Sequence, residues 1–213
     1  MNKTITIMGG SFNPIHNGHI ELAKTAYEQF ELDRILVMPS YNPSSYKDTS
    51  ELVSANDRCN MVSLAIEDYP YMELSTLEIE RGGKTYTADT LAQLLPDYNY
   101  IYFIIGADSL FALDHWYKPE YVMKNCHFLV ANRNEYPISE LSHKANELRS
   151  HYGAKISFIN MSDVPISSSD IRQKIKLGRD ISHMLPNTVY DYIKRHNLYN
   201  CNISHRNTEN CHE

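Results

Sequence analysis

The residues best suited to chemistry form two short segments near opposite ends of the chain. The first, GGSFNPIHNGH at residues 9–19, places His16 and His19 three positions apart. The second, ISSSDIR at residues 166–172, places three serines ahead of Arg172. Imidazole, hydroxyl and guanidinium groups donate hydrogen bonds, and two of the three can carry positive charge. Both segments therefore favour phosphate binding.

The first segment joins a predicted strand, residues 4–8, to a predicted helix. Gly9 and Gly10, directly after that strand, let backbone N–H groups approach an anion, and the helix N-terminus adds partial positive charge. If the helix begins at about His16, then His16 and His19 lie on one face and point at the same phosphate. Each could also be an ordinary surface histidine, but the pair beside the glycines favours the phosphate site.

The second segment opens another predicted helix. A serine at a helix N-cap is common in proteins. Several hydroxyl donors followed by Arg172 one turn later place more donors at one helix end than a simple cap needs, which suits a triphosphate.

Familiar nucleotide and zinc motifs are absent. Glycines 9, 10 and 18 do not fit GxGxxG, and GGKT at 82–85 is not a P-loop because Glu78 stands where the first glycine is required. The pair His16-x-x-His19 lacks the spacing and the glutamate of HExxH. Four residues near the C-terminus match no familiar zinc spacing: Cys201, His205, Cys211 and His212.

Short β-branched runs alternate with stretches of helical spacing, which predicts repeated βα units around a mostly parallel sheet. Strands are predicted at residues 4–8, 34–38, 72–79, 101–105, 127–131 and 156–159. Helices are predicted at about 20–30, from a cap at Asn56 or Asp57, and at 87–95, 139–151, 168–177 and 188–196. In such sheets ligands bind at the carboxyl ends of the strands, so the loops after residues 8, 38, 105 and 131 should carry the site.

Composition narrows the class of protein. The 213 residues include 20 Lys and Arg against 26 Asp and Glu, a net charge of −6, which argues against a nucleic-acid binder. Apolar residues make up 42%, with no long apolar run, so we expect a soluble, cytoplasmic protein without membrane contact. The four cysteines form no CxxC pair, which favours buried or idle thiols. We expect one domain at 1–199 and a polar, disordered tail at 200–213.

GGSFNPIHNGH and ISSSDIR resemble the two signature segments of the HxGH nucleotidylyltransferase superfamily, at a similar separation. Within it the chain most resembles the bacterial nicotinate-mononucleotide adenylyltransferase family, from about residue 4 to residue 199. The similarity extends to YTADT at 86–90, FIIGAD at 103–108, Trp116-Tyr117 and NLY at 197–199. It implies an α/β, Rossmann-like, doubly wound and mostly parallel sheet with helices on both faces, in a single domain.

The resemblance also implies an activity. Such enzymes transfer the adenylyl group of ATP to nicotinate mononucleotide, giving nicotinic acid adenine dinucleotide and pyrophosphate in NAD biosynthesis. Mg²⁺ would accompany ATP and bind through its phosphates, with no metal site on the protein. His16, His19 and Arg172 would be catalytic, with His19 nearest the transferring phosphate. The implied ATP-binding residues are Gly9, Gly10, Ser11, Gly18, Lys47, Gly106, Asp108, Ser167 and Ser168.

For the acceptor nucleotide, the resemblance implies that Trp116 stacks on the nicotinate ring. Thr87 and the backbone N–H of Tyr117 would recognise its carboxylate, and Arg133 would contact the substrate. Donors aimed at a carboxylate match a neutral amide poorly, which favours the acid over nicotinamide mononucleotide. Asp108 would approach a ribose, and a role as a helix cap is compatible with this.

Two positions depart from the family pattern. The family usually shows Pro-His-Lys where this chain has Ser45-Tyr46-Lys47, so a phosphate ligand and a surface lysine are equally supported for Lys47. Asn13 stands where Asp is frequent, and its effect on phosphate or metal handling is open.

Three alternative functions remain at this stage. The acceptor could be nicotinamide mononucleotide or phosphopantetheine, although phosphopantetheine adenylyltransferases are typically shorter and lack the YTADT and Trp-Tyr segments. A non-catalytic nucleotide-binding module is the third, against which His16, His19 and Arg172 argue. The sequence leaves open whether the protein forms a homo-oligomer.

Overall fold

The computed structural model describes residues 3–42, 52–132, 136–161 and 164–200. Its strands form one parallel sheet in the order β3-β2-β1-β4-β5-β6. They are β1 (Thr4–Gly10), β2 (Ile35–Pro39), β3 (Met72–Leu74), β4 (Tyr100–Gly106), β5 (His127–Ala131) and β6 (Lys155–Ile159). The strand order reverses between β1 and β4, which is where doubly wound sheets bind ligands. The predicted Rossmann-like α/β fold is confirmed.

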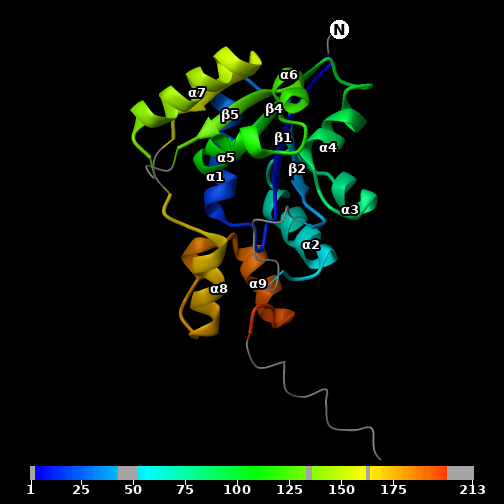
Figure 1. Cartoon of the computed structure of the whole chain (residues 1–213). Coiled ribbons are helices and arrows are strands. Elements are labelled where there is room, and N and C mark those ends of the chain that lie inside the picture. The colour runs from blue at the N-terminus through cyan, green and yellow to red at the C-terminus, as the bar shows by residue number, and fades with distance from the viewer. Residues whose placement is uncertain (1–2, 43–51, 133–135, 162–163, 201–213) are drawn as a thin grey trace, which may run out of the picture.

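Helices flank the sheet on both sides (Figure 1). One side has α1 (Asn17–Gln29), α2 (Ala55–Ile66), α8 (Ser168–Lys176) and α9 (Asn187–Arg195). The other has α4 (Thr87–Leu94), α5 (Ala107–Ala112), α6 (Pro119–Asn125) and α7 (Ile138–Tyr152). Short helices complete the chain: α3 (Leu77–Arg81) and the 3₁₀ turns η1 (Leu113–His115) and η2 (Ser182–Met184). None of the described helices is long and apolar enough to cross a membrane.

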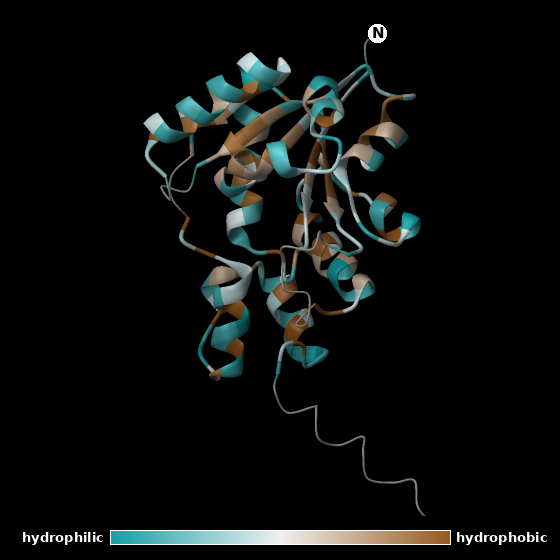
Figure 2. Cartoon of the chain, in the orientation of Figure 1, coloured by the Kyte–Doolittle hydropathy of each residue, from teal (hydrophilic) through white to brown (hydrophobic). Residues whose placement is uncertain are grey.

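The sheet separates two buried apolar clusters, which we call the α1 side and the α4 side after their helices. Successive strand residues point to opposite faces. In β4, Ile104 therefore packs on the α1 side while Phe103 and Ile105 pack on the α4 side. Figure 2 shows mostly hydrophobic colouring on the central strands and mixed hydrophilic and hydrophobic colouring on the helices. The continuous apolar run predicted at 101–105 is thus a central strand buried on both faces.

The predicted strand at 72–79 is wrong in its second half. The strand β3 ends at Leu74, and residues 77–81 form the helix α3. The alternating pattern places Glu78 among residues that would face a core, and Glu78 is indeed buried, but its partner is the hydroxyl of Thr90 on α4 at 2.7 Å. This tertiary hydrogen bond favours a helical turn over a longer strand.

Two predicted boundaries also differ from the structure. Gly9 and Gly10 belong to β1 instead of following it, because Gly10 still pairs with Pro39 of β2. The N-cap of α2 is Ser54, not Asn56 or Asp57, and its Oγ accepts the Asp57 N–H at 3.0 Å.

Cys59 and Cys126 are free, buried thiols, as predicted, and burial raises the pKa of both. Cys201, Cys211 and the rest of 201–213 lie outside the described residues, so the predicted tail stays a prediction.

Candidate active site

The two histidines of the first segment form a stacked pair where α1 begins. His16 is the N-cap of α1 and is only 1% exposed, and His19 lies one turn later. Their ring centroids are 3.8 Å apart, and the backbone N–H of His16 donates to Nδ1 of His19 at 3.3 Å. An accepting Nδ1 carries no proton, so the neutral His19 ring holds its proton on Nε2. The two rings therefore lie together at the helix start, as their spacing predicts, while their contact with a phosphate stays a prediction.

The glycines of this segment allow close packing around the pair. A Cβ at Gly18 would lie 3.1 Å from Nδ1 and Cε1 of His16, so Gly18 lets the His16 ring lie over the first turn of α1. A Cβ at Gly10 would lie 3.2 Å from the Phe12 ring. Gly106 differs, because a Cβ there would meet nothing within 4 Å and its φ is −82°. The protein's own packing therefore does not require glycine at the end of β4.

The second segment docks directly on the first. Ser167 is the N-cap of α8, and its Oγ accepts the Asp170 N–H at 3.1 Å. Ser168 Oγ donates to the Pro14 carbonyl at 2.8 Å. Arg172 Nη1 donates to the Asn13 carbonyl at 2.9 Å.

The tertiary structure therefore brings the two predicted segments together, although Ser168 and Pro14 are 154 positions apart. In the described contacts, Ser168 and Arg172 hold the backbone of the β1–α1 loop.

A buried arginine beneath this loop escaped the sequence analysis. Arg58 of α2 is 1% exposed. Its Nη1 donates to the carbonyls of Ser11, at 2.8 Å, and Ser40, at 2.7 Å, while Nη2 donates to Tyr41 at 3.2 Å. Burial lowers the pKa of Arg58 from its usual value. One side chain therefore joins the loops that follow β1 and β2.

A sequence signal for Arg58 exists. It precedes Met61 by three positions and Ala65 by seven, so it lies on the apolar stripe of α2. A cation on such a stripe is costly to bury unless polar groups surround it. This spacing indicates a buried arginine with dedicated partners, although it does not name them.

Asn13 and Tyr199 form a second support for the loop. Asn13 is 4% exposed, and its Oδ1 accepts from the Val53 N–H at 3.2 Å and from the Tyr199 hydroxyl at 3.0 Å. Burial raises the pKa of Tyr199. Asn13 thus links the β1–α1 loop to the segment before α2 and to the C-terminal end of the described chain.

The predicted acceptor residues gather on the α4 side. Thr87 is the first residue of α4, and its neighbour Tyr86 packs against the exposed Tyr117 ring, with centroids 4.6 Å apart. Trp116 is partly buried, and its ring meets Phe103 and Phe128 edge-on at 6.4 Å. Its buried Nε1–H has no acceptor among the described residues. The structure therefore brings the Thr87 and Trp116 segments together.

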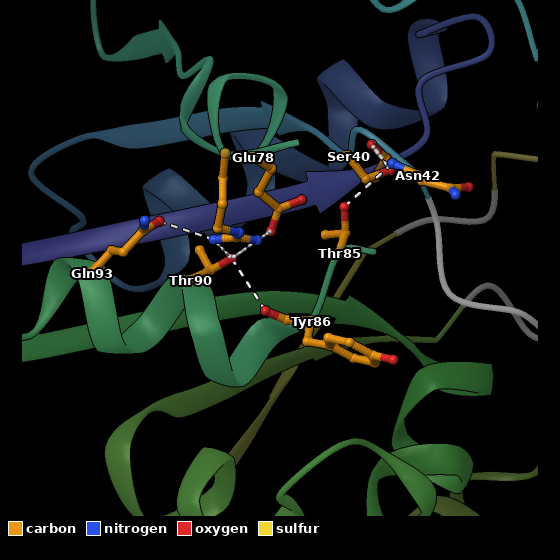
Figure 3. A network of polar contacts seen from close by, with 9 residues as sticks. Ser40, Asn42, Glu78, Thr85, Tyr86, Thr90 and Gln93 are labelled. Carbon is orange, nitrogen blue, oxygen red and sulfur yellow. Dashed lines mark hydrogen bonds and ion pairs between the residues drawn. The ribbon is translucent and has the colours of Figure 1, made fainter. Parts of the chain in front are cut away.

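Polar contacts between α3 and α4 support the acceptor side (Figure 3). Thr90 donates to Glu78 at 2.7 Å, and Arg81 donates to Thr90 at 3.2 Å and to Gln93 at 2.9 Å. Burial raises the pKa of Glu78, while the Thr90 hydrogen bond and the Arg81 charge oppose this. The Thr85 N–H donates to the carbonyl of Asn42 at 3.2 Å.

This network connects the start of α4 to the loop after β2, which in turn contacts Arg58.

Three remaining predictions concern single residues. Asp108 lies in the first turn of α5, and its Oδ1 accepts from the Tyr136 hydroxyl at 2.7 Å. The N-cap of α5 is Gly106, so Asp108 does not have the alternative role of helix N-cap, and its ribose contact stays a prediction. Lys47 and Arg133 lie outside the described residues.

Comparison with known proteins identifies the family of this chain. The profile of the cytidylyltransferase-like family matches residues 7–174. The chain belongs to that family. A relative from Lachnoclostridium phytofermentans, named a probable nicotinate-nucleotide adenylyltransferase, is 42% identical over 200 residues, covering 92% of this chain and 99% of the relative. A protein of the same name from Dehalococcoides mccartyi is 40% identical over 199 residues, covering 91% and 95%.

Solved structures of nicotinic acid mononucleotide adenylyltransferase are similar to this chain. Plasmodium falciparum nicotinic acid mononucleotide adenylyltransferase in complex with APC is 25% identical, with a TM-score of 0.73, covering 92% of this chain and 97% of that chain. The same enzyme in complex with NaAD is 25% identical, with a TM-score of 0.72 and the same coverage. The family membership predicted from the two signature segments is confirmed.

Proposed function

We propose that this cytidylyltransferase-like protein transfers the adenylyl group of ATP to nicotinate mononucleotide. The products are nicotinic acid adenine dinucleotide and pyrophosphate, in NAD biosynthesis. The observation that carries the proposal is the His16–His19 pair at the start of α1, joined to the start of α8 by Ser168 and Arg172. The names of the bacterial relatives and the Plasmodium enzyme support the same activity.

The reaction needs positioning and charge stabilisation, not a covalent intermediate. An oxygen of the mononucleotide phosphate attacks the α-phosphorus of ATP in line, and the bond to pyrophosphate breaks. Nε2–H of His19 donates to the transferring phosphate, and His16 contacts the phosphates beside it. Arg172 holds the β- and γ-phosphates. Losing one such donor costs about 3 to 4 kcal/mol of transition-state stabilisation.

The rest of the ATP site lies along the carboxyl ends of β1 and β4. Gly106 leaves open space there, which lets a ligand approach the backbone closely. Tyr136 holds Asp108 through Oδ1, and the carboxylate accepts a ribose hydroxyl through Oδ2. The remaining contacts with ATP come from Gly9, Gly10, Ser11, Gly18, Ser167, Ser168 and Lys47.

The acceptor site lies on the α4 side. Trp116 stacks on the nicotinate ring, and Thr87 with the Tyr117 N–H binds the nicotinate carboxylate. Arg133 contacts the same mononucleotide. An amide in place of the carboxylate presents a donor where an acceptor is needed, which gives the preference for the acid.

Mg²⁺ would accompany ATP and be held by its phosphate oxygens. When bound there, it would supply positive charge beside the departing pyrophosphate.

One assay tests the function against its alternatives. The protein is incubated with ATP, Mg²⁺ and each of nicotinate mononucleotide, nicotinamide mononucleotide and phosphopantetheine, and pyrophosphate and the product mass are measured. We expect the highest kcat/KM with nicotinate mononucleotide. A higher value with either other acceptor would reassign the substrate. Tight ATP binding with no pyrophosphate from any acceptor would indicate a non-catalytic module.

A further inference from the structure

Arg58 takes no part in the proposed reaction, yet it is buried at the edge of the candidate site. Its guanidinium is the only described group that donates to carbonyls of both the Ser11 loop after β1 and the Ser40–Tyr41 loop after β2. A fourth contact runs from Nε to the Val53 carbonyl at 3.4 Å. These loops lie at the carboxyl edge of the sheet, next to the switch point between β1 and β4. Arg58 thus joins two loops of the ligand edge from below.

The direction of these carbonyls determines the direction of the neighbouring N–H groups. In a planar trans peptide, the carbonyl of one residue and the N–H of the next point in opposite directions. The Ser11 and Ser40 carbonyls point at Arg58, so the N–H groups of Phe12 and Tyr41 point away from it. No backbone carbonyl of the described segments accepts either N–H.

The charge of Arg58 also acts on these loops. No described carboxylate lies within ion-pair distance of its guanidinium; all its hydrogen bonds go to neutral carbonyls. A guanidinium stays protonated in proteins, and a buried charge is screened less than an exposed one. A net positive charge therefore lies beneath the β1 and β2 loops.

We infer that Arg58 is a positioning residue for the triphosphate of ATP. It turns the Ser11 and Ser40 carbonyls inward so that the Phe12 and Tyr41 N–H groups face the phosphates, and its charge attracts them. The inference rests on the proposed function only in taking ATP as the phosphate ligand.

Two substitutions separate the parts of this role. Arg58→Met keeps much of the length and removes both the charge and the donors. Arg58→Lys keeps a charge but loses the planar fork that reaches two loops. The matched control is Arg149→Met, because Arg149 also donates to a backbone carbonyl, that of Ile156 at 2.7 Å, but on α7. Binding of ATP and of inorganic triphosphate is measured by calorimetry without acceptor, on protein shown to be folded by circular dichroism.

We expect Arg58→Met to weaken binding of both phosphates by at least about tenfold and Arg58→Lys by less, since charge-assisted contacts are strong. Arg149→Met should bind within about twofold of wild type. The acceptor KM of Arg58→Lys should stay within about twofold while its KM for ATP rises. This split distinguishes positioning from a purely structural role, which would lower the melting temperature and leave triphosphate binding by the folded protein unchanged.

Unchanged triphosphate binding in folded Arg58→Met, or in Arg58→Lys should the Met variant fail to fold, overturns the inference. The result is independent of the acceptor. Wild-type protein that makes no dinucleotide but loses triphosphate binding on substitution of Arg58 would contradict the proposed function and support this inference.

Discussion

The ATP side and the acceptor side of the candidate site differ in the balance of polar and aromatic contacts around their predicted ligand-binding residues. On the ATP side, buried or partly buried polar side chains bond to backbone carbonyls: Arg58 to three loop residues, Ser168 to Pro14, and Arg172 to Asn13. On the acceptor side, aromatic rings meet one another, as in Tyr86 with Tyr117 and Trp116 with Phe103.

The difference follows from the ligands each side would bind. Phosphate oxygens need donors at defined angles and distances, so the loop that presents them must be held rigidly. A flat ring is bound mainly through the surface area that it buries, and stacked aromatic rings tolerate small changes in their relative position. The extremes of exposure differ, because His16 is 1% exposed and Tyr117 is 47% exposed. The two sides overlap in exposure, however, because His19 and Arg172 are as partly buried as Trp116.

The largest expected effect on the ATP side is that of His19→Ala. We expect kcat to fall about 100- to 1,000-fold, because a donor to the transferring phosphate is lost. The melting temperature should change little, since His19 is partly exposed. Steady-state kinetics checks this, with His143→Ala on the exposed face of α7 as the control. Wild-type kcat in folded His19→Ala would remove His19 from the mechanism.

The matching test of the acceptor side is Trp116→Ala. Loss of stacking on one ring costs about 1 to 3 kcal/mol, so the KM for nicotinate mononucleotide should rise about 5- to 150-fold. ATP binding measured without acceptor should stay within about twofold. Trp116→Phe should recover part of the loss, because a phenyl ring still packs against Phe103 and Phe128. A larger effect on ATP than on the acceptor would contradict the division into two sides.

Tyr199→Phe tests how the ATP-side loop is held. Removing the hydroxyl leaves Asn13 Oδ1 with one fewer donor, which should lower the free energy of unfolding by about 1 kcal/mol. Urea unfolding measures this, with Tyr152→Phe on α7 as the control. No difference between the two variants would show that the Asn13 contact does not stabilise the loop.

The smallest expected effect is on the acceptor-side network. A carboxyl whose pKa is raised by folding, as burial raises that of Glu78, contributes stability below its unfolded pKa and loses it as pH rises through the folded pKa. The melting temperature of Glu78→Gln relative to wild type should therefore increase from pH 4 to pH 7.5, by no more than about 4 °C. Glu140→Gln, exposed on α7, is the control. A relative decrease with pH would contradict the sign.

Local patterns predicted much of the fold because they depend on near neighbours in the chain. The run at 101–105 is apolar throughout, which is typical of a central parallel strand, and the serines at 167–168 are ordinary helix-start residues. The same reasoning failed for residues 75–79. Their alternation fits a strand, but residues 77–81 form the helix α3, in which Glu78 accepts a hydrogen bond from Thr90 of α4. Single-residue contacts over such separations leave no periodic signal.

The sequence by itself determined the α/β class, the family and the two segments proposed to bind phosphate, because residue types and short spacings carry that information. Only the tertiary structure decided what holds those segments in place. Arg58 bridges loops from two strands, Ser168 reaches Pro14 across 154 positions, and Tyr199 closes on Asn13. Each contact joins segments that are far apart in the sequence, so its geometry is a property of the folded chain.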